Sequence, residues 1–222
     1  MESLNLGINH LQTLEEDLFQ TMPNLSTICL SHNQLGNSEN IFKNLHNLKA
    51  VMLSNNQFTE INSLLFNCLK SLKIIDFSNN NISFVSSEVF KDTPNIEILD
   101  LSFNQIDSIN PTIISSIPNL KLFNLKRNRL KSIDEAIFSG SKRLEVIDLS
   151  ENKVELIEPG LFNGLNKLKL LYLNSNVIKQ VHSDLFIDAV SLERVDLSNN
   201  PIEEFDQSEF KGLSKEVEVL YV

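Results

Sequence analysis

The sequence has few of the residues that mark linkers, disulfide scaffolds or membrane spans. Among its 222 residues there are no tryptophans, two tyrosines, two cysteines, six glycines and six prolines. The scarcity of glycine and proline leaves no low-complexity linker. No run of 18 apolar residues could span a bilayer, and the first residues lack the basic and apolar regions of a secretory signal. We therefore expect one domain over residues 1–222, with no membrane insertion within this segment.

Positive charge is also scarce. Lysine and arginine number 19 against 29 aspartates and glutamates, which gives a formal net charge of −10. Proteins that bind nucleic acid generally need a basic surface to displace phosphate counterions, and anionic membranes attract the same kind of surface. The composition therefore predicts no nucleic-acid partner and no docking on an anionic membrane.

Residues arranged for catalysis or metal binding are missing as well. The four histidines do not join a carboxylate or cysteine at metal-ligand spacing, and no nucleophile elbow or phosphate-binding glycine loop is present. Cys29 and Cys68 fall at different repeat positions, so we expect them not to pair. The sequence predicts no catalytic residue, no metal site, no cofactor and no enzyme.

What the chain does contain is an internal repeat with asparagine as its most regular member. Successive asparagines lie 24 residues apart, with one step of 23 between Asn33 and Asn56. When this asparagine is numbered position nine, positions four, six and eleven are apolar, and phenylalanine fills position nineteen in eight of nine repeats. The repeats begin near residues 1, 25, 48, 72, 96, 120, 144, 168 and 192, and a partial tenth begins at 217.

A single repeat has too little apolar surface to form a core, so the repeats must stack to bury it. The pattern LxxLxLxxNxLxxIxxxxFxxxxx resembles the 24-residue "typical" leucine-rich repeat of Toll-like receptor, Slit-type and small leucine-rich proteoglycan ectodomains. This resemblance implies an α/β solenoid: a curved right-handed coil with a parallel β-sheet on the concave face, and loops with short 3₁₀ or helical turns on the convex face. The chain departs from the family pattern because it has no cysteine caps.

The recurrent asparagine has a physical explanation. Position nine lies where the chain leaves its strand, and backbone groups left unpaired in the interior need partners. An asparagine side chain offers both an acceptor and two donors, so it can bond its own repeat and the adjacent one. We expect a structural ladder formed by Asn33, Asn56, Asn80, Asn104, Asn128, Asn152, Asn176 and Asn200.

Function must then reside in the variable positions. Positions three, five, seven, eight and ten are expected to face solvent on the concave side. Position five carries aspartate in four repeats, the segment 126–131 is basic, and exposed aromatic residues flank it. Arginine and aromatic residues dominate the energetics of protein interfaces. The predicted ligand-binding residues are Asp100, Phe103, Asn124, Arg127, Asp148 and Tyr172. Two other interpretations remain open. The first is that the aspartates form only a solvated face that belongs to the repeat consensus, and the second is that the basic segment 126–131 is a functionally neutral charge cluster.

The sequence thus favours a non-enzymatic module that binds a protein ligand and belongs to a secreted or cell-surface receptor, adhesion or matrix protein. The alternatives are a structural scaffold that associates through its ends or convex face, for example as a homodimer, and a cytoplasmic adaptor. Asn24 and Asn81 lie in Asn-X-Ser sequons and are candidate glycosylation sites.

Overall fold

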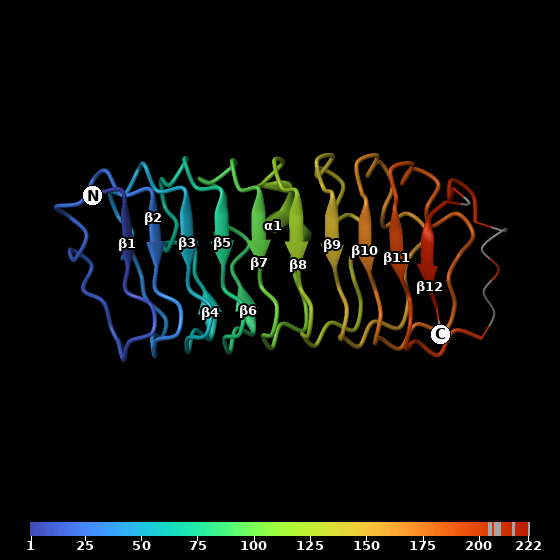
Figure 1. Cartoon of the computed structure of the whole chain (residues 1–222), viewed down its shortest axis with the longest axis horizontal. Coiled ribbons are helices and arrows are strands. Elements are labelled where there is room, and N and C mark those ends of the chain that lie inside the picture. The colour runs from blue at the N-terminus through green and yellow to red at the C-terminus, as the bar shows by residue number, and fades with distance from the viewer. Residues whose placement is uncertain (204–205, 207–209, 215, 222) are drawn as a thin grey trace.

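The computed structural model describes residues 1–203, 206, 210–214 and 216–221, so Val222 of the expected tenth repeat lies outside the described residues. Its main element is a ten-stranded sheet that runs along the length of an elongated stack of coils, with the two termini at opposite ends (Figure 1). The strands are β1 (Ser3–Asn5), β2 (Thr27–Cys29), β3 (Ala50–Met52), β5 (Ile74–Asp76), β7 (Ile98–Asp100), β8 (Leu122–Asn124), β9 (Val146–Asp148), β10 (Leu170–Tyr172), β11 (Arg194–Asp196) and β12 (Glu218–Leu220).

Every strand of this sheet is parallel to its neighbours and follows them in chain order. Paired residues come from equivalent repeat positions, as when Ile98 lies opposite Leu122. The one short repeat leaves the register intact, because Thr27 lies opposite Ala50. The predicted solenoid with a parallel sheet is therefore confirmed.

The helical part is smaller than the α/β description suggests. Within the described residues it is the single helix α1 (Pro111–Ser115). Asn110 caps it by accepting a hydrogen bond from the Thr112 N–H, and proline occupies the first helical position, where no N–H is needed. The other coils return through turns and extended segments.

A second, two-stranded sheet was not anticipated. It pairs β4 (Glu60–Ile61) with β6 (Phe84–Val85) on the return side of the third and fourth coils. At its outer edge Asn37 Oδ1 accepts the N–H groups of Thr59 and Glu60 at 2.9 and 3.2 Å. The short second repeat thus uses a side-chain amide in place of a neighbouring strand.

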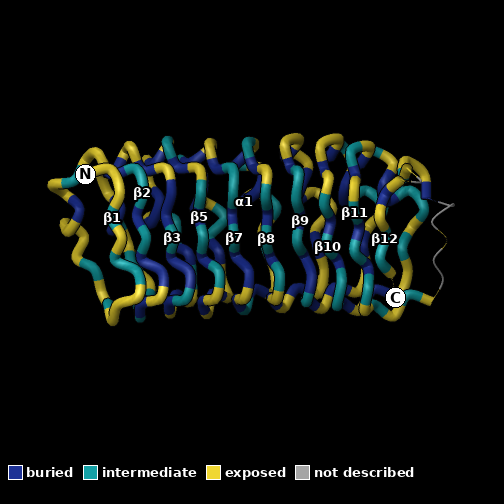
Figure 2. The backbone as a smooth tube through the Cα atoms, viewed as in Figure 1, coloured by how far each residue is buried: buried dark blue, intermediate teal, exposed yellow. Residues whose placement is uncertain are grey.

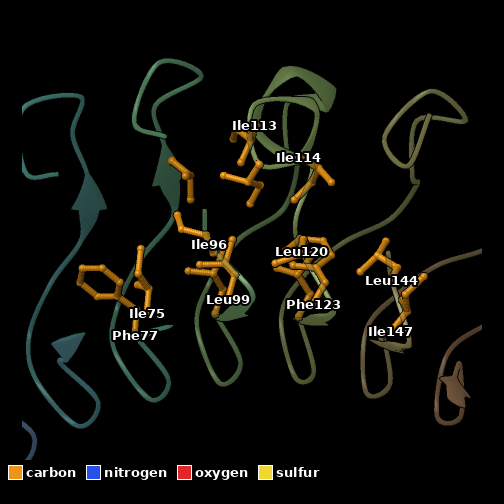
Figure 3. Close-up of a cluster of buried hydrophobic side chains, with 14 of the residues drawn as sticks. Ile75, Phe77, Ile96, Leu99, Ile113, Ile114, Leu120, Phe123, Leu144 and Ile147 are labelled. Carbon is orange, nitrogen blue, oxygen red and sulfur yellow. The ribbon is translucent and has the colours of Figure 1, made fainter. Parts of the chain in front are cut away.

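The core lies between the main sheet and the returning segments, and Figure 2 shows buried backbone along the length of the stack. Position-nineteen phenylalanines stack from coil to coil, with ring centroids 6.4 Å apart for Phe19–Phe42, 6.2 Å for Phe42–Phe66 and 6.1 Å for Phe66–Phe90. At the fifth coil the column holds Ile114, which is fully buried and comes from α1 (Figure 3). The column of position-nineteen side chains thus stays apolar and buried where isoleucine replaces phenylalanine.

The position-nine asparagines link each coil to the one before it. Asn104 is representative: its Nδ2 donates to the carbonyls of Leu101 at 3.1 Å and Phe77 at 3.0 Å, and its Oδ1 accepts the Ile82 N–H at 2.9 Å. Equivalent bonds are made by Asn33, Asn56, Asn80, Asn128, Asn152, Asn176 and Asn200. These hydrogen bonds fix the conformation of the turn at the end of each strand, and the turn fixes the position of the residues that follow it.

Candidate functional site

The solvent-facing side of the ten-stranded sheet, which we call the sheet face, displays side chains in rows. Because the strands are in register, equivalent positions of neighbouring coils lie side by side. Asp100 lies opposite Asn124, Asn124 opposite Asp148, and Asp148 opposite Tyr172. Four of the six predicted ligand-binding residues are therefore consecutive in one row. Together with Asp76 and Asp196, which continue it at either end, we call this the acidic row.

The aspartates of the acidic row also support the backbone. In each, Oδ1 accepts the N–H of the residue two positions later, as Asp100 does from Ser102 at 2.9 Å. Asp100 Oδ2 accepts a further hydrogen bond from Asn124 Nδ2 at 2.9 Å. Burial raises the pKa of Asp100, while the hydrogen bonds from Ser102 and Asn124 act in the opposite direction. One oxygen of each carboxylate is thus used to hold a turn.

Position seven faces solvent in some coils and is buried in others, so that expectation holds only in part. Ser31, Ser54, Ser102 and Ser150 are all buried. The Ser102 and Ser150 hydroxyls each donate to the aspartate two residues earlier at 2.6 Å, and the Ser54 hydroxyl donates to that of Ser31 at 2.9 Å. At the same position Ser78, Lys126, Asn174 and Ser198 remain partly exposed. The sheet face is therefore built from positions three, five, eight and ten, and from position seven where its residue is partly exposed, as Lys126 is.

Phe103 and Arg127 are brought into direct contact. The Arg127 guanidinium carbon lies 5.3 Å from the centroid of the Phe103 ring, within the range of a cation–π interaction. Both residues are exposed and occupy position eight, where the backbone is left-handed with φ of 55° and 54°. This conformation, which recurs once per coil, turns position eight outward immediately beyond the acidic row.

Our reading of the sequence missed a second row. Position three carries five consecutive apolar residues that lie in register and remain partly exposed on the sheet face: Ile74, Ile98, Leu122, Val146 and Leu170. We call this row the apolar stripe. It ends at Arg194 on one side and at the small, buried Ala50 on the other. The signal was present in the sequence as a position-three column, which is apolar in these five repeats and polar at both ends of the chain.

A row of alternating charges lies at the amino ends of the strands, directly before the apolar stripe. Glu97 accepts from Lys73 and Lys121, each at 2.7 Å, and Glu145 pairs with Lys169 at 2.8 Å. The hydrogen bonds from Lys121 and Lys73 lower the pKa of Glu97 from 4.5 to about 2. These charges are already compensated by one another.

The lowered pKa of Glu97 predicts a pH-dependent contribution to stability. Because the folded-state pKa lies below the unfolded value, the contribution is complete above pH 4.5 and is lost as the pH falls toward about 2. Glu97→Gln should therefore unfold at a lower urea concentration than the wild type at pH 7, and at the same concentration below pH 2. Urea titrations at the two pH values measure this, with the exposed Glu88→Gln as control. A difference that persists below pH 2 would contradict the assignment.

The remaining candidate residues lie apart from the sheet-face rows. Cys29 lies in β2 and the exposed Cys68 in a turn, and both are free. Asn24 and Asn81 are exposed, as glycan acceptors must be. The described residues contain no group of three or more histidine, cysteine or acidic side chains placed to hold a metal. Nor does any helix in this part of the chain have the length and apolar character needed to cross a bilayer.

The fold and surface together define a repeat solenoid that presents an ordered, open sheet. Comparison with protein families supports the same class. A model described as leucine rich repeat matches residues 46–106, 70–130, 94–154, 118–178 and 142–202 in overlapping windows. The chain therefore belongs to the leucine-rich repeat family. A search of curated protein sequences found no match.

Solved structures with this fold include two receptor ectodomains. The TLR13 chain in its ssRNA13 complex is 29% identical with a TM-score of 0.84, over 90% of this chain and 28% of that one. Toll of Drosophila, in complex with Spatzle, is 21% identical with a TM-score of 0.86, over 100% of this chain and 31% of that one. An internalin from Listeria monocytogenes is 22% identical with a TM-score of 0.81, over 99% and 60%. This chain thus spans less than a third of the two receptor chains.

Proposed function

We propose that this chain is a non-catalytic recognition module that binds a protein partner through its sheet face. The observation that carries the proposal is the adjacency of Phe103 and Arg127 to the acidic row, where Asp100, Asn124, Asp148 and Tyr172 follow one another across four strands. Arginine and aromatic residues are the side chains most enriched at the energetic centres of protein interfaces.

The rigidity of this surface favours binding. Its side chains stand on strands and turns that are held by backbone pairing and by the asparagine ladder. A surface that is already ordered loses little conformational entropy on association, so more of the contact energy appears as affinity. The sheet face can therefore dock a folded partner without rearrangement.

A protein is the favoured partner because of charge. The TLR13 chain, which has this fold, occurs in a complex with ssRNA, so the fold by itself does not exclude nucleic acid. Here, however, four aspartates line the middle of the sheet face, Lys126 is paired with Glu151 at 3.1 Å, and the net charge is −10. This distribution repels a phosphate backbone.

An extracellular or cell-surface location is part of the proposal. Toll was solved in glycosylated form with Spatzle, and another similar fold is the FLRT2 leucine-rich repeat of an assembly with Latrophilin 3 and Unc5D. The exposed sequons at Asn24 and Asn81 are consistent with such a location. A scaffold or cytoplasmic adaptor remains the alternative.

The test is a double substitution in the centre of the sheet face. A partner captured by the wild-type protein should bind Arg127→Glu/Tyr172→Ala at least about 30-fold more weakly, since the loss of even one hot-spot residue costs on the order of 2 kcal/mol. Surface plasmon resonance measures this loss. Because Arg127 is exposed and Tyr172 is only partly buried, the thermal unfolding midpoint should not change.

The matched control is Arg143→Glu, which reverses an exposed arginine on a turn outside the sheet. It should bind the partner with wild-type affinity. Equal affinity of the wild type and the double variant would show that the centre of the sheet face is not part of the binding site.

A further inference from the structure

We infer that the partner presents an amphipathic α-helix across the strands, with its apolar side on the apolar stripe and a basic flank along the acidic row. This inference rests on the proposed function and specifies the chemistry of the partner. It follows from three features of the sheet face: a bounded apolar stripe, the spacing of its residues, and uncompensated charge along one side only.

The apolar stripe has the length of a short helix. Five strands separated by ~4.8 Å place its end residues, Ile74 and Leu170, about 19 Å apart. At ~1.5 Å per residue a helix covers this distance in about 13 residues, or three to four turns. The polar residue Arg194 and the small Ala50 mark its two ends. Five adjacent, partly exposed aliphatic side chains on a solvent-facing sheet form the kind of bounded apolar patch that marks an interaction site.

The spacing within the stripe favours a helix over an extended segment. Side chains on one face of a helix recur about every 5.4 Å, whereas the residues of the stripe recur every ~4.8 Å. After four strand steps the helix side chains are therefore displaced from the stripe residues by about 2.4 Å. In an extended chain the same-side spacing is about 6.7 Å, and the mismatch after four steps is about 7.6 Å, more than one strand spacing. Only the helix stays in register with Ile74, Ile98, Leu122, Val146 and Leu170 along the whole stripe.

Charge determines which flank of the helix is basic. On one side of the stripe the row of Lys73, Glu97 and Lys121 is internally paired. On the other side lie Asp76, Asp100, Asp148 and Asp196, and none of the ion pairs found within the described residues involves them. A complementary partner therefore carries lysine or arginine along this side.

The gaps in the acidic row add a pattern. Asp76 and Asp100 lie on neighbouring strands, whereas Asp100 and Asp148 are separated by Asn124, and Asp148 and Asp196 by Tyr172. One strand step of ~4.8 Å corresponds to about one helical turn of ~5.4 Å, and two strand steps correspond to about two turns. Because side chains on one flank of a helix recur about every 3 to 4 and about every 7 residues, basic residues of the partner helix should be spaced by about 3 or 4 residues and then by about 7 and 7.

The test uses two synthetic, fluorescently labelled peptides of 20 residues. Both are helix-forming with leucines along one side; one carries lysines along a single flank at the spacing above, and the other carries glutamates there. Binding is measured by fluorescence anisotropy at two salt concentrations. The lysine peptide should bind at least about 10-fold more tightly, with a preference that weakens at high salt.

Variants of the protein locate the peptide. Leu122→Ser should weaken binding of the lysine peptide about 10-fold, because an apolar contact at the centre of the stripe is lost. Val146→Ser provides a second stripe variant. Leu156→Ser, which changes an exposed leucine outside the sheet, should bind as the wild type does. Thermal unfolding of each variant reports on folding.

Asp100→Asn/Asp148→Asn removes charge while keeping the turns, since Asn124 makes the same hydrogen bond to the N–H two residues later at 3.0 Å. This variant should lose most of the preference for the lysine peptide. Failure of both peptides to bind, equal binding of the two, or indifference to Leu122→Ser and Val146→Ser would overturn the inference. If the captured partner nevertheless loses affinity for Arg127→Glu/Tyr172→Ala, the proposed function stands and only the helix is wrong. Indifference of that partner to Arg127→Glu/Tyr172→Ala and to Leu122→Ser would overturn both.

Discussion

Replacing Phe66 with alanine should lower the free energy of unfolding by about 3–5 kcal/mol. Phe66 is fully buried and lies in the phenylalanine column between Phe42 and Phe90. Its ring centroid is 6.2 Å from that of Phe42, 6.1 Å from that of Phe90 and 6.0 Å from that of Phe77. Removing it opens a cavity between the second, third and fourth coils that the stacked neighbours cannot fill without shifting the register of the sheet.

Urea unfolding followed by circular dichroism measures this effect. The control is Phe84→Ala, which truncates a phenylalanine that is 58% exposed and should change stability by less than about 0.5 kcal/mol. In a solenoid each coil contacts only its neighbours, so damage at one interface also uncouples the two halves of the stack. The transition of Phe66→Ala should therefore broaden. Similar stabilities for the two variants would show that the column is not the main source of cohesion.

Asn104→Asp should destabilise the protein by about 3–5 kcal/mol at pH 7, more than Asn104→Ala, for which we expect about 1–3 kcal/mol. The alanine variant leaves one buried donor, the Ile82 N–H, without its acceptor. The carbonyls of Phe77 and Leu101 keep a second partner, because Asn80 and Asn128 donate to them as well. The cost of losing the side chain is thus close to that of one unsatisfied group.

An aspartate at this position is worse because it can still accept from Ile82 but cannot donate. Its carboxylate would face the carbonyls of Phe77, Leu101 and Ser102, all within about 3 Å of the present amide nitrogen. Protonation restores one donor, so the stability of Asn104→Asp relative to Asn104→Ala should recover at pH 4. Urea titrations at the two pH values test this, with the exposed Asn81→Asp as control. A smaller loss for aspartate than for alanine at pH 7 would contradict the ladder geometry.

The repeat period predicted most of the fold because the same local problem is solved in each coil. The apolar residues at positions four and six, with phenylalanine near nineteen, can be buried only by stacking, and an asparagine at nine can serve both its own coil and the previous one. Parallel pairing and register follow directly from equal spacing. The one short repeat did not disturb this, since Asn37 supplies hydrogen bonds at the affected edge.

The candidate site was less accessible to sequence reasoning. The pattern indicated which positions vary, but not that Ser102 at position seven is buried and bonded to Asp100 or that Arg127 lies over Phe103. The contact between Arg127 and Phe103 depends on the left-handed backbone at position eight, which no glycine marks in this sequence. The apolar stripe was overlooked because Ile98 and Leu122 are unremarkable singly, and only their registration makes them a surface.

By itself the sequence determined that this chain is a stack of equivalent coils with a shared interior and an asparagine-linked turn, because burial and hydrogen-bond satisfaction act within a coil and its nearest neighbours. Only the tertiary structure decided which exposed side chains meet. Residues 24 positions apart become neighbours at the strand spacing of ~4.8 Å. Rows of charge and apolar surface therefore exist only once the coils are stacked.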